Sequence, residues 1–163
     1  MAQLPHVFTV EFSLMIYTSQ LHTDIGYVHI SANDTGIISI AFADNQICPS
    51  ENALSQLAAK QLSEYFNHQR TEFNLPLAAK GTHFQQRVWA ALCNIEFGQT
   101  ASYLDIANKV GNPRACRAVG AANGKNPIAI VVPCHRIIGS NGALTGYAGG
   151  MDRKSYLLTL ENS

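Results

Sequence analysis

The chain has 163 residues, 47% of them hydrophobic, and a formal net charge of zero at pH 7. This length and apolar content allow one large or two small domains with a real core, so the chain should fold by itself. Because it has no apolar run near the roughly 20 residues of a membrane span and no signal-peptide pattern, we expect a cytoplasmic protein without a membrane partner.

Short strands separated by turn residues dominate the first part of the chain. Apolar and β-branched runs predict strands at residues 7–17, 27–31 and 37–42, with turns at residues 24–26 and 33–36. We interpret these strands as a small antiparallel sheet.

A helix and one more strand complete this first part. An apolar stripe at helical spacing predicts a helix over residues 51–67, with Ser50 as its N-cap. Residues 73–77 are predicted as a strand, and the following segment 78–82 is the best candidate linker. We therefore expect an N-terminal domain over residues 1–80 and a second domain over residues 81–163.

Three helices are predicted beyond the linker. Apolar residues between positions 84 and 95 form the stripe of the first, which Phe97-Gly98 should end. Ser102 and Asp105 have the S-x-x-D spacing of a capping box and predict a short helix that stops at Gly111. Residues 114–123 form the third helix, so the last two have the outline of a helix-turn-helix.

The two halves of the chain carry opposite charge. Residues 1–80 hold three bases and seven acids, whereas residues 81–163 hold eight bases and four acids, so the halves have net charges of −4 and +4. A polyanion would be repelled by the first half and attracted by the second. If nucleic acid is the partner, only the second half should touch it.

Small residues are concentrated on the helix at 114–123, and two interpretations remain open. Alanine and glycine allow the helix to pack closely on a neighbour. Alternatively, a slim helix that carries Arg114, Arg117 and the nearby Lys125 can lie against a phosphate backbone, even in a narrow groove.

Cys134 differs from Cys48, Cys93 and Cys116, which we interpret as free thiols and as small core residues. No cysteine belongs to a CxxC pair, so the pattern predicts neither a zinc site nor a disulfide framework. His135 and Arg136 follow Cys134 directly, and positive charge near a sulfur favours the reactive thiolate. Pro133 predicts a turn at this point. A nucleophilic thiol and a buried thiol with solvent-facing neighbours are both compatible with this pattern.

The segment 126–136, Asn-Pro-Ile-Ala-Ile-Val-Val-Pro-Cys-His-Arg, resembles the signature of the O6-alkylguanine-DNA alkyltransferases. Further stretches resemble motifs of that family in the same order, at residues 97–103, 111–113, 117–120, 146–150 and 157–161. Members of this family repair DNA by moving an alkyl group from guanine onto their own cysteine. The resemblance is strong over residues 81–162 and looser before them.

The resemblance implies a role for each matching residue. Cys134 would be the alkyl acceptor, with His135 as a base acting through a water molecule and Glu161 orienting the imidazole. Asn126 would hold the backbone near the site, and Tyr103 would offer its phenolic proton as guanine departs. Because the product is a thioether, each molecule would react once, without turnover and without a cofactor.

The same resemblance implies a partner and a binding mode. The partner would be double-stranded DNA with O6-alkylguanine, or less well O4-alkylthymine, bound through the minor groove by a monomer. The lesion is out of reach in a stacked duplex, so the nucleotide must be flipped out. Arg117 would fill the gap that it leaves. The expected DNA contacts are Arg114, Arg117, Ala118, Ala122, Lys125 and Arg136.

The glycine-rich run at residues 142–150 could by itself be a flexible surface loop, but the resemblance implies that it forms a wall of the base pocket. The expected pocket residues are Val132, Ser140, Tyr147 and Gly149, and glycines would let the backbone approach the base. Ala148 stands where family members often have serine, which removes one hydroxyl contact. The zinc ligands of some family members are not recognisable, so we expect no metal.

The expected fold class is α+β. A small N-terminal α/β domain with a mainly antiparallel sheet would precede a mainly helical, winged-helix-like domain that carries the helix-turn-helix.

Three rival functions are a lesion-binding protein without catalysis, a cysteine hydrolase and a transcription regulator that reads the major groove. The lesion-binding relatives have tryptophan in place of the acceptor, and Cys134 argues against that rival.

Overall fold

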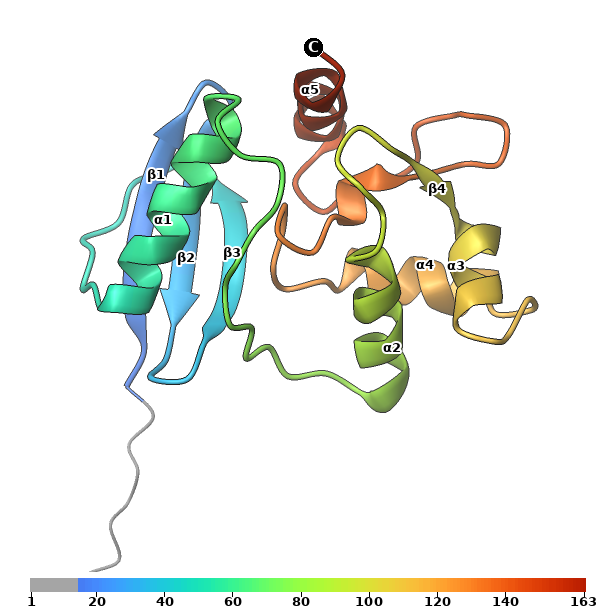
Figure 1. The fold of residues 1–163 in the computed structure, drawn as a ribbon, viewed down its shortest axis with the longest axis horizontal. Helices are drawn as coiled ribbons and strands as arrows, with labels where there is room; N and C mark the ends of the chain where they lie inside the picture. Colours follow the sequence, from blue (N-terminus) through green and yellow to red (C-terminus); the bar gives the residue numbers. More distant parts are fainter. Residues whose placement is uncertain (1–14) are drawn as a thin grey trace, which may run out of the picture.

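The computed structural model describes residues 15–163 and has the expected α+β architecture (Figure 1). The first half contains an antiparallel sheet in the order β1-β2-β3 and one helix packed on it. Its elements are β1 (Tyr17–Thr23), β2 (Gly26–Ala32), β3 (Ile37–Ala43) and α1 (Ala53–Phe66). No helix within residues 15–163 has the length and apolar character needed to span a bilayer.

The second half is mainly helical and follows an extended connection (Figure 1). Its helices are α2 (His83–Leu92), α3 (Tyr103–Lys109), α4 (Cys116–Gly124) and α5 (Met151–Glu161). Two short strands, β4 (Ala101–Ser102) and β5 (Ile137–Ile138), pair in parallel, and the one-turn 3₁₀ helix η1 (Cys134–Arg136) leads into β5. Helices α3 and α4 pack on each other and on α2, which is the expected helix-turn-helix arrangement.

A tight turn sets the register of the first hairpin. Only residues 24 and 25 connect β1 to β2, and Gly26 has a φ of +106°, which favours glycine. Thr23 therefore pairs with Gly26, and β1 must run up to Thr23. The predicted first strand at 7–17 was wrong at its C-terminal end, because the pairing partner rather than the apolar run decides where the strand stops. Positions 7–14 of that prediction lie outside the described residues.

The start of α1 and the segment after it also differ from expectation. Asn52 is the N-cap of α1, in a capping box with Ser55, whereas the backbone of Ser50 pairs with Thr18 at the edge of the sheet. The predicted strand at 73–77 is reduced to a bridge between Leu77 and Ile37. Pro76 has no N–H to donate, so a longer ladder cannot form there.

The helices of the second half begin and end within a few residues of the predicted positions. Ser102 caps α3, and the expected capping box with Asp105 is present, with reciprocal distances of 3.1 and 2.8 Å. Helix α2 ends at Leu92 instead of continuing to Ile95, because the next backbone bonds are the i to i−3 type of a tight turn.

The two halves share one continuous core, and β3 is bonded directly to the second half. The N–H of Ile40 donates to the carbonyl of Pro127, and the N–H of Ala129 donates to the carbonyl of Ile40, both at 2.9 Å. Buried apolar residues of β2, β3 and α1 belong to the same cluster as those of α2, α4 and α5. The first half is therefore in a position to shape the site described below.

The capping box of α3 gives a stability prediction. We expect Ser102→Ala to lower the free energy of unfolding by about 1 kcal/mol, because the N–H of Asp105 loses its acceptor. Urea denaturation at pH 7 measures this difference. Ser155→Ala, at an exposed position inside α5, is the matched control and should change the value by less than about 0.5 kcal/mol. Equal values for the two variants would contradict the capping role.

Candidate active site

Pro133 turns the chain immediately before Cys134, as expected. It has φ −82° and ψ 62°, and it is the N-cap of the 3₁₀ helix η1. Successive side chains of a 3₁₀ helix point about 120° apart. Cys134 and His135 are neighbours in sequence but leave the backbone in different directions, and both are buried. The interpretation of the other cysteines as core residues was wrong for Cys48 and Cys93, which are exposed.

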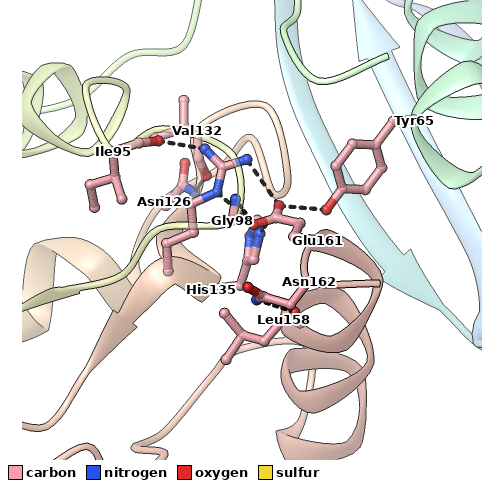
Figure 2. A network of polar contacts seen from close by, with 10 residues as sticks. Tyr65, Ile95, Gly98, Asn126, Val132, His135, Leu158, Glu161 and Asn162 are labelled. Carbon is pink, nitrogen blue, oxygen red and sulfur yellow. Dashed lines mark hydrogen bonds and ion pairs between the residues drawn. The ribbon is translucent and has the colours of Figure 1, made fainter. Parts of the chain in front are cut away.

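The carboxylate of Glu161 collects hydrogen bonds from four other residues (Figure 2). Its Oε1 accepts from His135 Nε2 at 2.7 Å and from the hydroxyl of Tyr65 at 2.7 Å. Arg136 donates to both oxygens at 2.9 Å, and the N–H of Gly98 approaches Oε2 at 3.4 Å. The predicted partnership of His135 and Glu161 is therefore present in the geometry.

Arg136 is not available for DNA, which corrects the expectation that it is a DNA contact. Its side chain is buried. Nε and Nη2 donate to the carboxylate of Glu161, and Nη1 donates to the carbonyl of Ile95 at 2.5 Å. A buried carboxylate needs a paired cation to offset the loss of its hydration. Arg136 meets that need, so its charge is neutralised inside the protein.

Burial sets the resting protonation states of the thiol and the imidazole. It raises the pKa of the Cys134 thiol, although a hydrogen bond from Asn126 opposes the shift. It also lowers the pKa of His135, against the opposite effect of Glu161. The resting site holds a neutral thiol and a neutral imidazole. The expectation that positive neighbours stabilise a thiolate was wrong for this state, because the imidazole is uncharged and Arg136 is paired.

The tautomer of His135 follows from its partner. Burial alone would raise the pKa of Glu161, but the bonds from His135, Arg136 and Tyr65 outweigh it and lower the pKa to about 2. An ionised carboxylate only accepts, so Nε2 of His135 must carry the proton. Nδ1 is then an unprotonated acceptor, and it is buried without a hydrogen-bond partner within residues 15–163. The imidazole is prepared to receive a proton at Nδ1.

Asn126 closes the loop that leads to the cysteine. Its amide nitrogen donates to the carbonyl of Val132 at 2.8 Å, and its amide oxygen accepts from the N–H of Ile128 at 3.0 Å. Ile130, inside this loop, has a φ of +71°, which is strained for a β-branched residue. The side chain of Asn126 thus helps hold a strained segment beside Cys134, as the sequence implied.

A cavity of about 160 Å³ borders Cys134. Residues from both halves line it, namely Ile40, Ala41, Phe42, Asn123, Asn126, Pro127, Ala129, Cys134, Tyr147, Ala148 and Gly149. The hydroxyl of Tyr147 and Oδ1 of Asn123 are buried and lack hydrogen-bond partners in the described chain. Two unpaired polar atoms from lining residues suit a small ligand with its own polar groups.

Of the four predicted pocket residues, Tyr147 and Gly149 line this cavity, and Val132 and Ser140 do not. Val132 is buried and contributes its carbonyl to Asn126 instead of its side chain to the pocket. Ser140 is exposed at the start of the loop. Tyr103 is also absent from the lining; its hydroxyl lies 2.6 Å from Oγ1 of Thr145 and so ties α3 to the loop.

Three residues near the site were missed in the sequence. Tyr65 reaches Glu161 from the first half of the chain, and Asn123 borders the cavity from α4. Lys154 is fully buried and donates to the carbonyls of Ile137 and Thr145, while burial lowers its pKa. The spacing of Lys154 and Glu161, seven residues apart on α5, places them on one helix face and was an available signal.

Helix α4 has one exposed face that carries most of the predicted DNA contacts. Arg117, Ala118 and Lys125 are exposed, as is Arg114 just before the helix. Ala122 is only 3% exposed, and its carbonyl accepts from Trp89, so its predicted contact was wrong. Ala121 is exposed in its place, which the four-residue spacing from Arg117 would have indicated.

Two family models match the chain. One, described as 6-O-methylguanine DNA methyltransferase, DNA binding domain, matches residues 83–163. The other, described as 6-O-methylguanine DNA methyltransferase, ribonuclease-like domain, matches residues 16–79. Together the two matches cover nearly the whole of the described chain.

Two curated relatives span almost the same length. The methylated-DNA--protein-cysteine methyltransferase of Mycolicibacterium paratuberculosis is 45% identical over 153 residues, which are 90% of this chain and 93% of that protein. The protein of the same name from Methanosarcina barkeri is 43% identical over 155 residues, or 91% of this chain and 98% of that protein.

Solved structures share the arrangement of both halves. The crystal structure of the Mycobacterium tuberculosis O6-methylguanine methyltransferase has a TM-score of 0.81 at 43% identity, over 90% of this chain and 93% of that one. The structure of Mycobacterium tuberculosis OGT in complex with DNA has a TM-score of 0.80 at 43% identity, over 87% and 90% of the two chains.

The hydroxyl of Tyr65 gives a prediction about stability and pH. A group with a lowered folded pKa contributes stability above its unfolded pKa, here about 4.5, and that contribution is lost as the pH falls toward about 2. Tyr65→Phe removes one of the bonds that lower the pKa of Glu161. We expect it to cost about 2 kcal/mol of unfolding free energy at pH 7, and the deficit should narrow as the pH falls below about 4.5.

Denaturant titrations of wild type and variant between pH 7 and pH 2 measure this difference. Tyr27→Phe is the matched control, because the Tyr27 ring stacks on His22 at the sheet surface and is remote from Glu161. A deficit of the same size at every pH would contradict the coupling between Tyr65 and Glu161.

Proposed function

Because this chain belongs to the 6-O-methylguanine DNA methyltransferase family, we propose that it repairs DNA by moving the alkyl group of O6-alkylguanine onto its own Cys134. The protein is a methylated-DNA--protein-cysteine methyltransferase that binds DNA. The observation that carries the residue assignment is the buried Cys134 at the wall of a small cavity, next to an imidazole with a free Nδ1.

The reaction is a displacement at the alkyl carbon. The thiol proton leaves Cys134 for Nδ1 of His135 through one water molecule, and Glu161 stabilises the imidazolium that forms. The sulfur forms a bond to the alkyl carbon as the bond from that carbon to O6 of guanine breaks. The electron pair of the broken bond passes to the guanine ring, which takes a proton from the hydroxyl of Tyr103 and becomes ordinary guanine. The proton taken up by His135 returns through water to the tyrosinate.

The raised pKa of Cys134 does not prevent the reaction, because the thiol loses its proton as the sulfur attacks. A buried thiolate would be costly at rest, but the proton need only leave when the sulfur lone pair is being used. The hydroxyl of Tyr103 meets the departing guanine, and Tyr147 supplies an unpaired hydroxyl to the base. Tyr103 is held against Thr145 and would exchange that bond for the base.

The product is a thioether, which fixes the stoichiometry. A thioether has no easily displaced group and no acyl carbon for water to attack. Each molecule therefore repairs one lesion and is consumed. Cys134 itself argues for this reaction over binding without catalysis, because lesion-binding relatives have tryptophan in place of the acceptor.

DNA binds through the exposed face of α4, which lies in the minor groove. Arg114 and Lys125 contact phosphates, and small residues such as Ala118 allow close approach. Arg117 enters the duplex where the damaged nucleotide has been flipped out. Contacts of this kind carry little sequence information, which suits a protein that must find lesions anywhere.

The two halves divide these tasks. We assign DNA binding and alkyl acceptance to residues 81–163, and we treat residues 1–80 as a domain that completes the site. The protein acts as a monomer on double-stranded DNA, with O4-alkylthymine as a poorer substrate. Since a reduced thiol is consumed in each reaction, the cytoplasm is a suitable compartment.

Methyl transfer provides the direct test. Incubation with a duplex that contains one O6-methylguanine should add the mass of one methyl group to the Cys134 peptide, with at most one lesion repaired per molecule. Cys134→Ser should bind the duplex and repair nothing, whereas Cys93→Ser, at an exposed thiol away from the cavity, should react normally. A methyl group on another cysteine, or repeated repair by one molecule, would overturn the proposal.

The role of Arg117 is tested by comparing two substrates. We expect Arg117→Ala to slow the single-turnover reaction with duplex DNA by about tenfold, because base flipping loses its support. Reaction with the free base O6-methylguanine should change by less than about twofold, since no base is flipped. Arg70→Ala, which removes an arginine paired with Glu64 in the first half, is the control. Equal losses on both substrates would argue against this role.

A further inference from the structure

The cavity beside Cys134 has one wall that belongs to the first half of the chain. Residues 40–42 of β3 line it, together with residues 147–149 of the loop before α5. The reacting sulfur, its base and the DNA-facing helix all lie in the second half. The wall is therefore a contribution of the first half to the site itself.

Phe42 is the largest of the three side chains that β3 contributes to the cavity wall. A Cβ atom added to Gly149 would lie 3.0 Å from Cδ2 of Phe42, so the ring already packs directly against the loop. The guanidinium carbon of Arg153 lies 5.1 Å from the centroid of the same ring, which is a cation–π contact. The ring is held in contact with both the loop and α5.

Hydrogen bonds on both sides keep this wall in place. The backbone bonds of Ile40 to Pro127 and Ala129 attach β3 to the segment that precedes Cys134. Arg153 also donates to the carboxylate of Asp44 at 2.7 Å and to the carbonyl of Ile25 at 2.9 Å. These bonds fix β3 on both sides of Phe42, at Ile40 and at Asp44.

The size of the cavity makes this wall important for substrate choice. Its volume of about 160 Å³ is well below the roughly 300 Å³ at which pockets for drug-sized ligands begin. The alkyl carbon must lie next to the sulfur that attacks it, so the whole alkyl group has to fit on this side of the base. A rigid aromatic ring in the wall limits how large that group can be.

We propose that Phe42 determines the largest alkyl group that the protein accepts, and that the first half of the chain thereby sets the specificity of the second. The inference rests on the proposed function, because it concerns the substrate of the same cysteine. Small groups such as methyl fit with the ring in place, whereas a benzyl group competes with the ring for space.

The test is the ratio of two single-turnover rates, with O6-benzylguanine and O6-methylguanine each placed in the same duplex. Phe42→Ala should raise the benzyl-to-methyl ratio by about tenfold or more, and Phe42→Leu should raise it less. Phe42→Trp should lower the ratio. Phe84→Ala, which removes a partly buried phenylalanine of α2 away from the cavity, is the control and should leave the ratio unchanged.

The possible outcomes separate this inference from the proposed function. If the wild-type protein transfers neither group to Cys134, the proposed function fails. If it transfers both and Phe42→Ala slows both equally, with Phe42→Trp also leaving the ratio unchanged, Phe42 has no part in specificity. A ratio is insensitive to the fraction of folded protein, so partial destabilisation of a variant does not mask the result.

Discussion

The carboxylate of Glu161 is the interaction on which the site depends. A buried negative charge is costly unless it is paired and hydrogen-bonded, and this one is paired with Arg136 and also bonded to His135 and Tyr65. These bonds fix the tautomer of the imidazole and bring residues of α1, η1 and α5 to one point. Removal of any donor would leave the charge less compensated, so the same bonds serve both stability and reactivity.

A buried, neutral Cys134 is compatible with a reactive one. Burial raises the pKa of the thiol and would protect it from indiscriminate reaction at rest. An acceptor that can be used only once gains from such protection, because any unrelated alkylation or oxidation would consume the molecule. In the proposed reaction, reactivity depends on a substrate that occupies the cavity and on His135, whose Nδ1 is already unprotonated.

The first half of the chain is more than a stable support for the second. Its sheet is bonded through Ile40 to the segment before the cysteine, Tyr65 donates a hydrogen bond to the carboxylate of Glu161, and Phe42 forms part of the cavity wall. The acidic character of this half, with a net charge of −4, would keep it from competing with the proposed DNA-binding face of α4. The contributions of this half are therefore made inside the protein, at its contact with the second half.

Local chemistry in the sequence was enough to predict the capping box of Ser102, the hairpin turn before Gly26 and the turn at Pro133, whereas the role of the Cys134 segment followed only from its resemblance to a known family. These features depend on residues a few positions apart. Tyr65 and Glu161 are separated by 96 positions, so no local sequence pattern predicts their hydrogen bond. The burial of Arg136 and Ala122 and the protonation of Cys134 were likewise decided by tertiary packing, because the cost of removing a group from water depends on what surrounds it in the folded chain.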